Sequence, residues 1–180
     1  MKTVARVLIV FLGMILLANA GSAEQGAALH VLLSEVRPGS MGTEHYCMLV
    51  FDDHHFHAEK ALRRLGKDRE RMVYEGQLSD SDWSALTAIV DAKQFRELRV
   101  PPSPPALVVS DPHPYTISVA RSGGFQNMEF LTKASLKPFE AEVKPLLRWW
   151  DVSRNQRTTP SEAPVDARCS LNDATGIFSN

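Results

Sequence analysis

The chain has 180 residues, of which 44% are hydrophobic and 23% are charged, and its formal net charge at pH 7 is −1. This length and composition suit a single globular domain that can bury a core of its own. The weak, mixed charge excludes the basic footprint of a nucleic-acid-binding protein and the polybasic surface of a protein adsorbed to a membrane.

The first 23 residues have the pattern of a secretory signal peptide. Lys2 and Arg6 give a positive start, residues 7–17 are apolar, and residues 18–20 read Ala-Asn-Ala. We expect cleavage after Ala20 or Ala23. Because the apolar run is shorter than the ~20 residues of a membrane span, the mature protein is expected to be periplasmic or secreted, without a stable membrane span.

Two strands are predicted near the start of the mature chain. Residues 29–36 (LHVLLSEV) form an apolar run that ends before Pro38, which breaks regular structure. Residues 45–51 (HYCMLVF) form a second run, rich in residues that favour strands, and it stops at Asp52 and Asp53. The second run is the most apolar strand of the mature sequence.

Residues 54–65 fit both a helix and a strand. As a helix, the segment has Asp53 as its N-cap and an apolar stripe from Ala58 to Leu65. As a strand, it supplies a partner for residues 72–75 across a glycine-containing loop. The pattern alone leaves both alternatives open.

A helix is predicted to begin after Ser79 and to run to about Lys93. Ser79 as N-cap with Asp82 three residues later forms a capping-box pattern. Apolar residues then follow at helical spacing: Trp83, Leu86, Ile89 and Val90. We expect this face of the helix to be buried.

A proline-rich connector and a hairpin come next. Four prolines exclude residues 100–105 from a helix or a central strand, so this segment is expected to be a stiff, extended connector. Residues 115–119 alternate between polar and apolar side chains, residues 122–124 form a turn, and residues 125–131 return. This pattern predicts a β-hairpin with one buried face.

The last predicted element is a helix over residues 136–150, which Pro145 is expected to kink or split. From residue 151 onward the chain is polar, and we expect a largely disordered tail. The order of elements predicts a single α+β domain over residues 24–150: a curved antiparallel sheet with two helices packed on one face.

The eight residues after the second predicted strand (DDHHFHAE) are the densest cluster of metal-capable side chains. Imidazole and carboxylate suit zinc, copper or nickel. In a strand, His55, His57 and Glu59 project from one face, which His45 joins in some hairpin registers. In a helix, the neighbouring pairs are His54 with His57 and His55 with Glu59. A divalent metal is the one cofactor that this cluster suggests.

Cys47 and Cys169 are the two cysteines of the chain. Outside the cytoplasm they can form one disulfide that ties the polar C-terminal segment to the core. The alternative is two separate thiols, one buried and one exposed. Cys47 lies in the most apolar strand, where a thiol is usually inert, so it is not expected to be a nucleophile.

Trp149 is the candidate interface residue. It lies on the opposite side of its predicted helix from Trp150, which belongs to the apolar stripe. We therefore expect Trp149 to be exposed, and an exposed tryptophan can mark a contact surface for another molecule. Partial cover by the C-terminal tail is the alternative.

The sequence resembles a family of uncharacterised exported bacterial domains. In these domains a strand with the motif YEG precedes a helix that closes on F-x-x-L, followed by a hairpin. Here residues 73–76 read VYEG, residues 78–79 read LS, and the capped helix ends in QFREL at residues 94–98. The resemblance implies a secreted α+β domain of unknown function and transfers no site residues.

No motif in the sequence fixes a reaction: serine-nucleophile elbows and phosphate-binding loops are missing from it. We expect an exported, non-enzymatic domain that binds a protein or a cell-envelope component. One alternative is a metal-binding protein that uses the histidine cluster of residues 54–57. The other is a hydrolase with dispersed catalytic residues.

Overall fold

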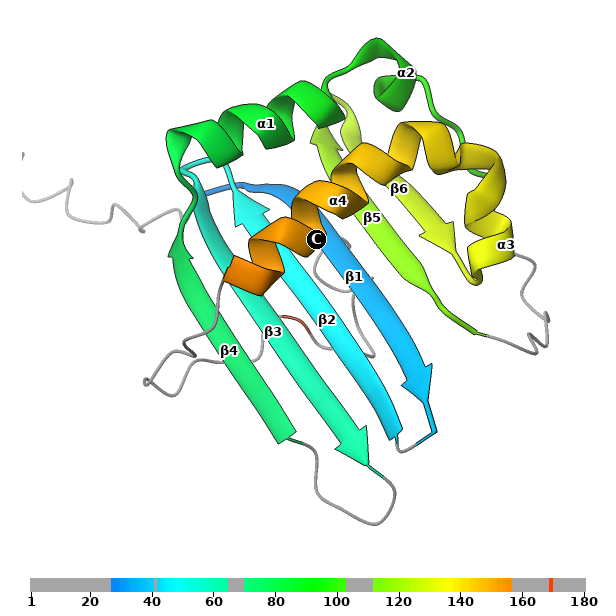
Figure 1. Cartoon of the computed structure of the whole chain (residues 1–180). Helices are drawn as coiled ribbons and strands as arrows, with labels where there is room; N and C mark the ends of the chain where they lie inside the picture. The colour runs from blue at the N-terminus through cyan, green and yellow to red at the C-terminus, as the bar shows by residue number, and fades with distance from the viewer. Residues whose placement is uncertain (1–26, 41, 65–69, 103–111, 157–168, 170–180) are drawn as a thin grey trace, which may run out of the picture.

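The computed structural model describes residues 27–40, 42–64, 70–102, 112–156 and 169. They form an open six-stranded antiparallel sheet in the order β4-β3-β2-β1-β5-β6 (Figure 1). The strands are β1 (Leu29–Gly39), β2 (Gly42–Phe51), β3 (His55–Arg64), β4 (Glu70–Gln77), β5 (Tyr115–Arg121) and β6 (Gly124–Phe130). The helices are α1 (Asp80–Val90), α2 (Lys93–Arg96), α3 (Lys133–Leu136), the short 3-10 helix η1 (Lys137–Phe139) and α4 (Glu140–Gln156).

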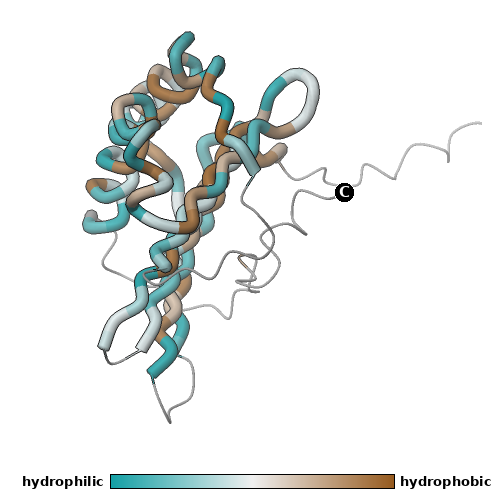
Figure 2. Tube along the Cα trace, turned by 90° about the vertical axis from the view of Figure 1, so that its right-hand side faces the viewer, coloured by the Kyte–Doolittle hydropathy of each residue, from teal (hydrophilic) through white to brown (hydrophobic). Residues whose placement is uncertain are grey.

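The helices all lie over one face of the sheet, as the view along the sheet edge shows (Figure 2). The predicted α+β fold is therefore confirmed. Apolar side chains from alternate positions of the strands fill the space beneath α1 and α4. The sheet contributes Val31, Leu33, Met48, Val50, Phe56, Ile117, Val119, Met128 and Phe130, and the helices contribute Leu86, Val90, Phe95, Val143, Leu146 and Trp150.

Residues 55–64 form the strand β3, so the helix alternative for this segment is wrong. The turn that precedes residue 55 favours the strand conformation. The amide of His54 donates to Phe51 O at 3.0 Å, and the carboxylate of Asp53 accepts from the amide of His55 at 3.0 Å. Asp53 therefore caps a tight turn instead of a helix, and β3 pairs with β2 on one side and β4 on the other.

The glycine of the YEG motif has a packing role in β4. Gly76 lies opposite Phe56 in the β3–β4 register, and a Cβ atom at this position would be 2.8 Å from the Phe56 ring. Because glycine has no side chain, the ring can pack directly over the backbone of β4.

Ser79 is the N-cap of α1, as predicted, and its hydroxyl accepts a hydrogen bond from the amide of Asp82 at 3.1 Å. The helix ends at Val90, short of the expected Lys93, and the chain continues into α2. The side-chain amide of Gln126 on β6 donates to the carbonyl of Phe95 at 2.9 Å, which ties α2 to the sheet.

The last helix differs from its prediction in three ways. It begins at Glu140, because residues 136–139 belong to α3 and to the 3-10 helix η1. Pro145 lies inside α4 without splitting it. The helix continues to Gln156, so the expected boundary between domain and tail after Trp150 is wrong, because residues 151–156 are helical. The predicted signal peptide, residues 103–105 of the connector, and residues 157–168 and 170–180 of the tail lie outside the described residues. Among the residues described, no helix is long and apolar enough to cross a membrane.

Candidate functional site

His55, His57 and Glu59 lie together on the sheet face opposite the helices, here named the far face. They alternate along β3 with Phe56 and Ala58, whose side chains belong to the core beneath the helices. The structure thus places three of the four predicted ligands on one face of β3, as a strand requires. His57 and Glu59 are buried, and His55 is partly exposed.

His57 is held between two carboxylates. Its Nδ1 atom lies 2.6 Å from Glu75 Oε1, and its Nε2 atom lies 2.8 Å from Glu59 Oε1. Burial by itself lowers the pKa of His57, but the hydrogen bonds to Glu59 and Glu75 outweigh it and raise this pKa. The imidazolium is therefore favoured, and both of its nitrogens donate to protein carboxylates.

Glu75 of β4 is a member of this cluster that sequence analysis did not single out as a site residue. It lies opposite His57 in the β3–β4 register, and its Oε2 atom is 3.0 Å from His55 Nε2. The available signal was its position in the strand-like run 72–75. Because the sequence pattern leaves the strand partner of that run open, it does not identify the cross-strand neighbours of Glu75.

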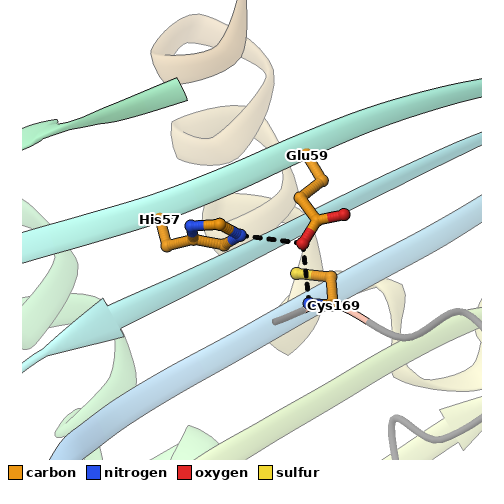
Figure 3. A group of neighbouring side chains, drawn as sticks. All are labelled: His57, Glu59 and Cys169. Carbon is orange, nitrogen blue, oxygen red and sulfur yellow. Dashed lines mark hydrogen bonds and ion pairs between the residues drawn. The ribbon is translucent and has the colours of Figure 1, made fainter. Parts of the chain in front are cut away.

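Cys47 and Cys169 form a disulfide, so the alternative of two separate thiols is wrong. Both cysteines are buried on the far face, beside Leu32 and Leu49. The backbone amide of Cys169 donates to Glu59 Oε1 at 2.8 Å (Figure 3). The disulfide therefore places a residue of the C-terminal segment directly on the histidine–carboxylate cluster.

One compact group of potential metal ligands occurs within the described part of the chain. The ligand atoms of His57, Glu59 and Cys169 all lie within 4.8 Å of one another. His45 and His55, the other predicted ligands, lie outside this group. His45 lies on the far face of β2, opposite Ala61 of β3. Its neighbour along that face of β2 is Cys47, which lies opposite Glu59.

A groove of about 480 Å³ opens on the helix-covered side, between the C-terminal part of α4 and strands β1–β4. Its side chains are mainly aromatic, cationic and apolar: Arg37, Tyr46, Met48, Ala58, Lys60, Tyr74, Trp150, Arg154 and Asn155. Glu59 also borders the groove, but its carboxylate bonds to His57 and Cys169 on the far face. A volume between 300 and 1,000 Å³ is typical of ligand sites.

Three cations surround the ring of Tyr46 in this groove. Arg37 Cζ, Lys60 Nζ and Arg154 Cζ lie 5.4, 5.3 and 5.0 Å from the ring centroid. These distances fall within the range of cation–π attraction. A hydrogen bond to the Tyr46 hydroxyl also raises the pKa of Lys60, which keeps the ammonium charged.

The carboxylate of Glu35 holds the guanidinium groups of Arg37 and Arg154 in position. This buried carboxylate accepts from Arg37 Nε at 2.6 Å and from Arg154 Nη1 at 2.7 Å, and His113 Nε2 lies 2.8 Å from the same group. Burial alone raises the pKa of Glu35, but these hydrogen bonds and one to Tyr115 lower it to about 2. Glu35 is therefore a permanent anion that orients both guanidinium groups.

Trp149 is buried, so the expected exposure of this residue is wrong. Only 9% of its surface is accessible, and its indole Nε1–H donates to the carbonyl of Asp82 at 3.1 Å. Because α4 packs against α1 and both Trp149 and Trp150 belong to the core cluster, two sides of the helix are covered. Trp149 thus offers little surface to a partner.

No protein-family model matches this sequence, and no curated protein matches it at a significant level. The resemblance to exported bacterial domains therefore stays a prediction.

Proposed function

We propose that the protein is an exported, non-enzymatic binding domain whose groove between α4 and β1–β4 holds an acidic segment of a partner protein. The observation that supports this most strongly is the arrangement of three cations around Tyr46. Aromatic rings and guanidinium groups are the side chains that dominate binding energy at protein interfaces. Their concentration in one concave site favours recognition of a protein over a purely structural role.

The cations favour an acidic ligand. Guanidinium groups bind carboxylates through paired, charge-assisted hydrogen bonds, and Glu35 already fixes the orientation of Arg37 and Arg154. Groups that are held in place before binding lose less conformational entropy when the ligand arrives.

Two acidic residues at the rim now contact these cations. Asp151 pairs with Arg154, and Glu44 Oε1 lies 3.7 Å from Lys60 Nζ. Both acidic side chains are substantially exposed, at 51% for Asp151 and 37% for Glu44. Exposed ion pairs contribute only about 0–1 kcal/mol, so a carboxylate of the ligand can replace them at little cost.

The aromatic and apolar surfaces favour a peptide that also carries hydrophobic side chains. Ala58 and Tyr74 are partly exposed and provide apolar and aromatic surface, and the buried side chains of Met48 and Trp150 support them from the core. Burial of apolar surface contributes roughly 25 cal/mol per Å². A peptide that alternates acidic and apolar side chains can use both the cations and this surface.

A random peptide library displayed on phage, selected against the purified protein, tests this function. We expect the selected peptides to be enriched in Asp and Glu next to an apolar residue, and to lose binding in Tyr74→Ala. Selected peptides without acidic enrichment would contradict the proposal. If a soluble polyuronate binds and displaces every selected peptide, the ligand is an acidic glycan and the peptide assignment is wrong.

A further inference from the structure

We propose that reduction of the Cys47–Cys169 disulfide creates a zinc site on the far face, with Cys47, Cys169, His57 and Glu59 as its ligands. The ligand atoms of His57, Glu59 and Cys169 already lie within 4.8 Å of one another. Cys47 Sγ is bonded to Cys169 Sγ and therefore lies next to one member of this group. All four residues are at most 5% exposed.

The sheet holds three of these ligands in fixed positions. Cys47 on β2 lies directly opposite Glu59 on β3, and His57 is two residues from Glu59 on the same face. Cys169 completes the set from the C-terminal segment, and its amide bonds to Glu59 (Figure 3). Ligands on paired strands lose little freedom when a metal binds, which favours affinity.

The surroundings of His57 match those of a zinc-binding histidine. Such a histidine usually donates its second ring nitrogen to a carboxylate, which orients the ring and increases its basicity. Here Nδ1 of His57 lies 2.6 Å from Glu75, which His55 in turn contacts at 3.0 Å. Nε2 is therefore the nitrogen that faces Glu59 and the sulfur atoms.

The geometry is within reach of a tetrahedral site. Zinc bonds of ~2.3 Å to sulfur and ~2.0–2.1 Å to nitrogen or oxygen place neighbouring ligand atoms about 3.3–3.8 Å apart. For His57, Glu59 and Cys169, the present limit of 4.8 Å therefore requires shifts of about 1 Å. Cys47 Sγ is outside that group and, once the disulfide is reduced, must also move away from Cys169 Sγ. A buried set of two thiolates, an imidazole and a carboxylate leaves no position for water, as in structural zinc sites.

The chemistry requires a two-electron reductant: a dithiol, or the phosphine used in the test. Thiol–disulfide exchange transfers two electrons and two protons to the Cys47–Cys169 bond, which becomes two thiols, while the dithiol becomes a disulfide. Zinc then displaces one proton from each thiol and the Nε2 proton of His57, all of which go to solvent. The disulfide and the metal thus occupy the same position in two different redox states.

Cobalt and zinc titrations of the purified chain test the proposal. The protein is reduced under anaerobic conditions with a phosphine, and Co²⁺ is followed by its visible bands and by the thiolate-to-cobalt charge-transfer band. Zinc affinity is measured by competition with a chromophoric chelator. We expect the reduced chain to bind one equivalent with tetrahedral, thiolate-containing spectra, and to bind zinc at least about 100-fold more tightly than the oxidised chain.

Variants separate this site from a simple pair of thiols. Replacing His57→Asn is expected to reduce affinity by more than about 100-fold, and Glu75→Gln by about 10–100-fold. His45→Asn, on the same face but outside the ligand group, is the matched control and should leave affinity unchanged. Equal affinity in the oxidised and reduced chains, or unchanged affinity in His57→Asn, would overturn the proposal.

Circular dichroism keeps the test decisive if reduction unfolds the chain. Zinc must then restore the native spectrum of the reduced wild type but not that of Cys47→Ser/Cys169→Ser. Failure of zinc to restore the wild type would also overturn the site. X-ray absorption of the zinc-loaded chain should show two sulfur and two nitrogen or oxygen neighbours, and a shell without sulfur would contradict the assignment.

Discussion

Glu35 on β1 accepts a hydrogen bond at 2.7 Å from Arg154 on α4, across a sequence separation of 119 residues. The same carboxylate binds Arg37, so one buried anion positions two of the three cations around Tyr46. The last helix and the groove are therefore joined to the first strand through a single charged side chain.

Replacing Glu35→Gln is expected to lower the free energy of unfolding by about 2–4 kcal/mol, because it removes the negative charge from a buried ion pair. Urea unfolding at neutral pH measures this loss. The exposed residue Glu129 on β6 is the matched control, and Glu129→Gln should change stability by less than about 0.5 kcal/mol. Equal stability of the two variants would show that Glu35 does not anchor the fold.

The stabilisation by Glu35 should disappear in acid. Burial alone raises the pKa of this carboxyl, but hydrogen bonds to Arg37, His113 and Arg154 lower it from 4.5 to about 2. Because the unfolded chain binds the proton more readily, the contribution is complete above about pH 4.5 and is lost as the pH falls toward 2. The stability difference between wild type and Glu35→Gln should therefore shrink by about 3 kcal/mol over this range.

The disulfide is expected to stabilise the oxidised protein by about 4–5 kcal/mol, since it closes a loop between residues separated by 122 positions. Urea unfolding of the wild type and of Cys47→Ser/Cys169→Ser, both in the presence of a chelator, gives the difference. Wild type reduced in the same buffer should match the double variant. A difference below about 1 kcal/mol would mean that the bond does not constrain the unfolded chain as proposed.

Trp149→Phe should reduce stability by about 1 kcal/mol and leave ligand binding unchanged. Phenylalanine keeps most of the packing against α1 but cannot donate to the carbonyl of Asp82. Thermal unfolding checks the first part, and a peptide selected in the library experiment checks the second. A large loss of affinity with no loss of stability would restore Trp149 as an interface residue.

Local patterns in the sequence predict most of the strands and α1, because alternation and capping are carried by neighbouring residues. The sequence pattern does not distinguish a strand from a helix at β3, since Ala58 and Ala61 are compatible with both a helical stripe and a strand. The conformation of β3 is determined by the turn at His54 and by pairing with β2 and β4. Local sequence pattern therefore does not predict the conformation of a segment that is determined by pairing with distant strands.

The site depends even more on contacts between distant residues. The hydrogen-bond partners of Glu35 come from β1, from the segment before β5 and from α4. The cluster around Glu35 therefore has no characteristic spacing in the sequence from which it could be predicted. The single apolar stripe of the helix predicts an exposed Trp149, whereas α4 packs on α1 and its side chains also join the core beside the strands. His57 and Glu59 could be predicted, because alternate positions of one strand share a face.

The most direct test of the proposed binding function compares two lysines with a labelled acidic peptide from the library selection. Fluorescence anisotropy gives its affinity for wild type, for Lys60→Gln in the groove, and for Lys93→Gln, which removes a lysine that is 85% exposed on α2. We predict an affinity loss of about 5–10-fold for Lys60→Gln, or about 1–1.4 kcal/mol, and none for Lys93→Gln. Equal affinities of the two variants would contradict recognition of an acidic ligand in this groove.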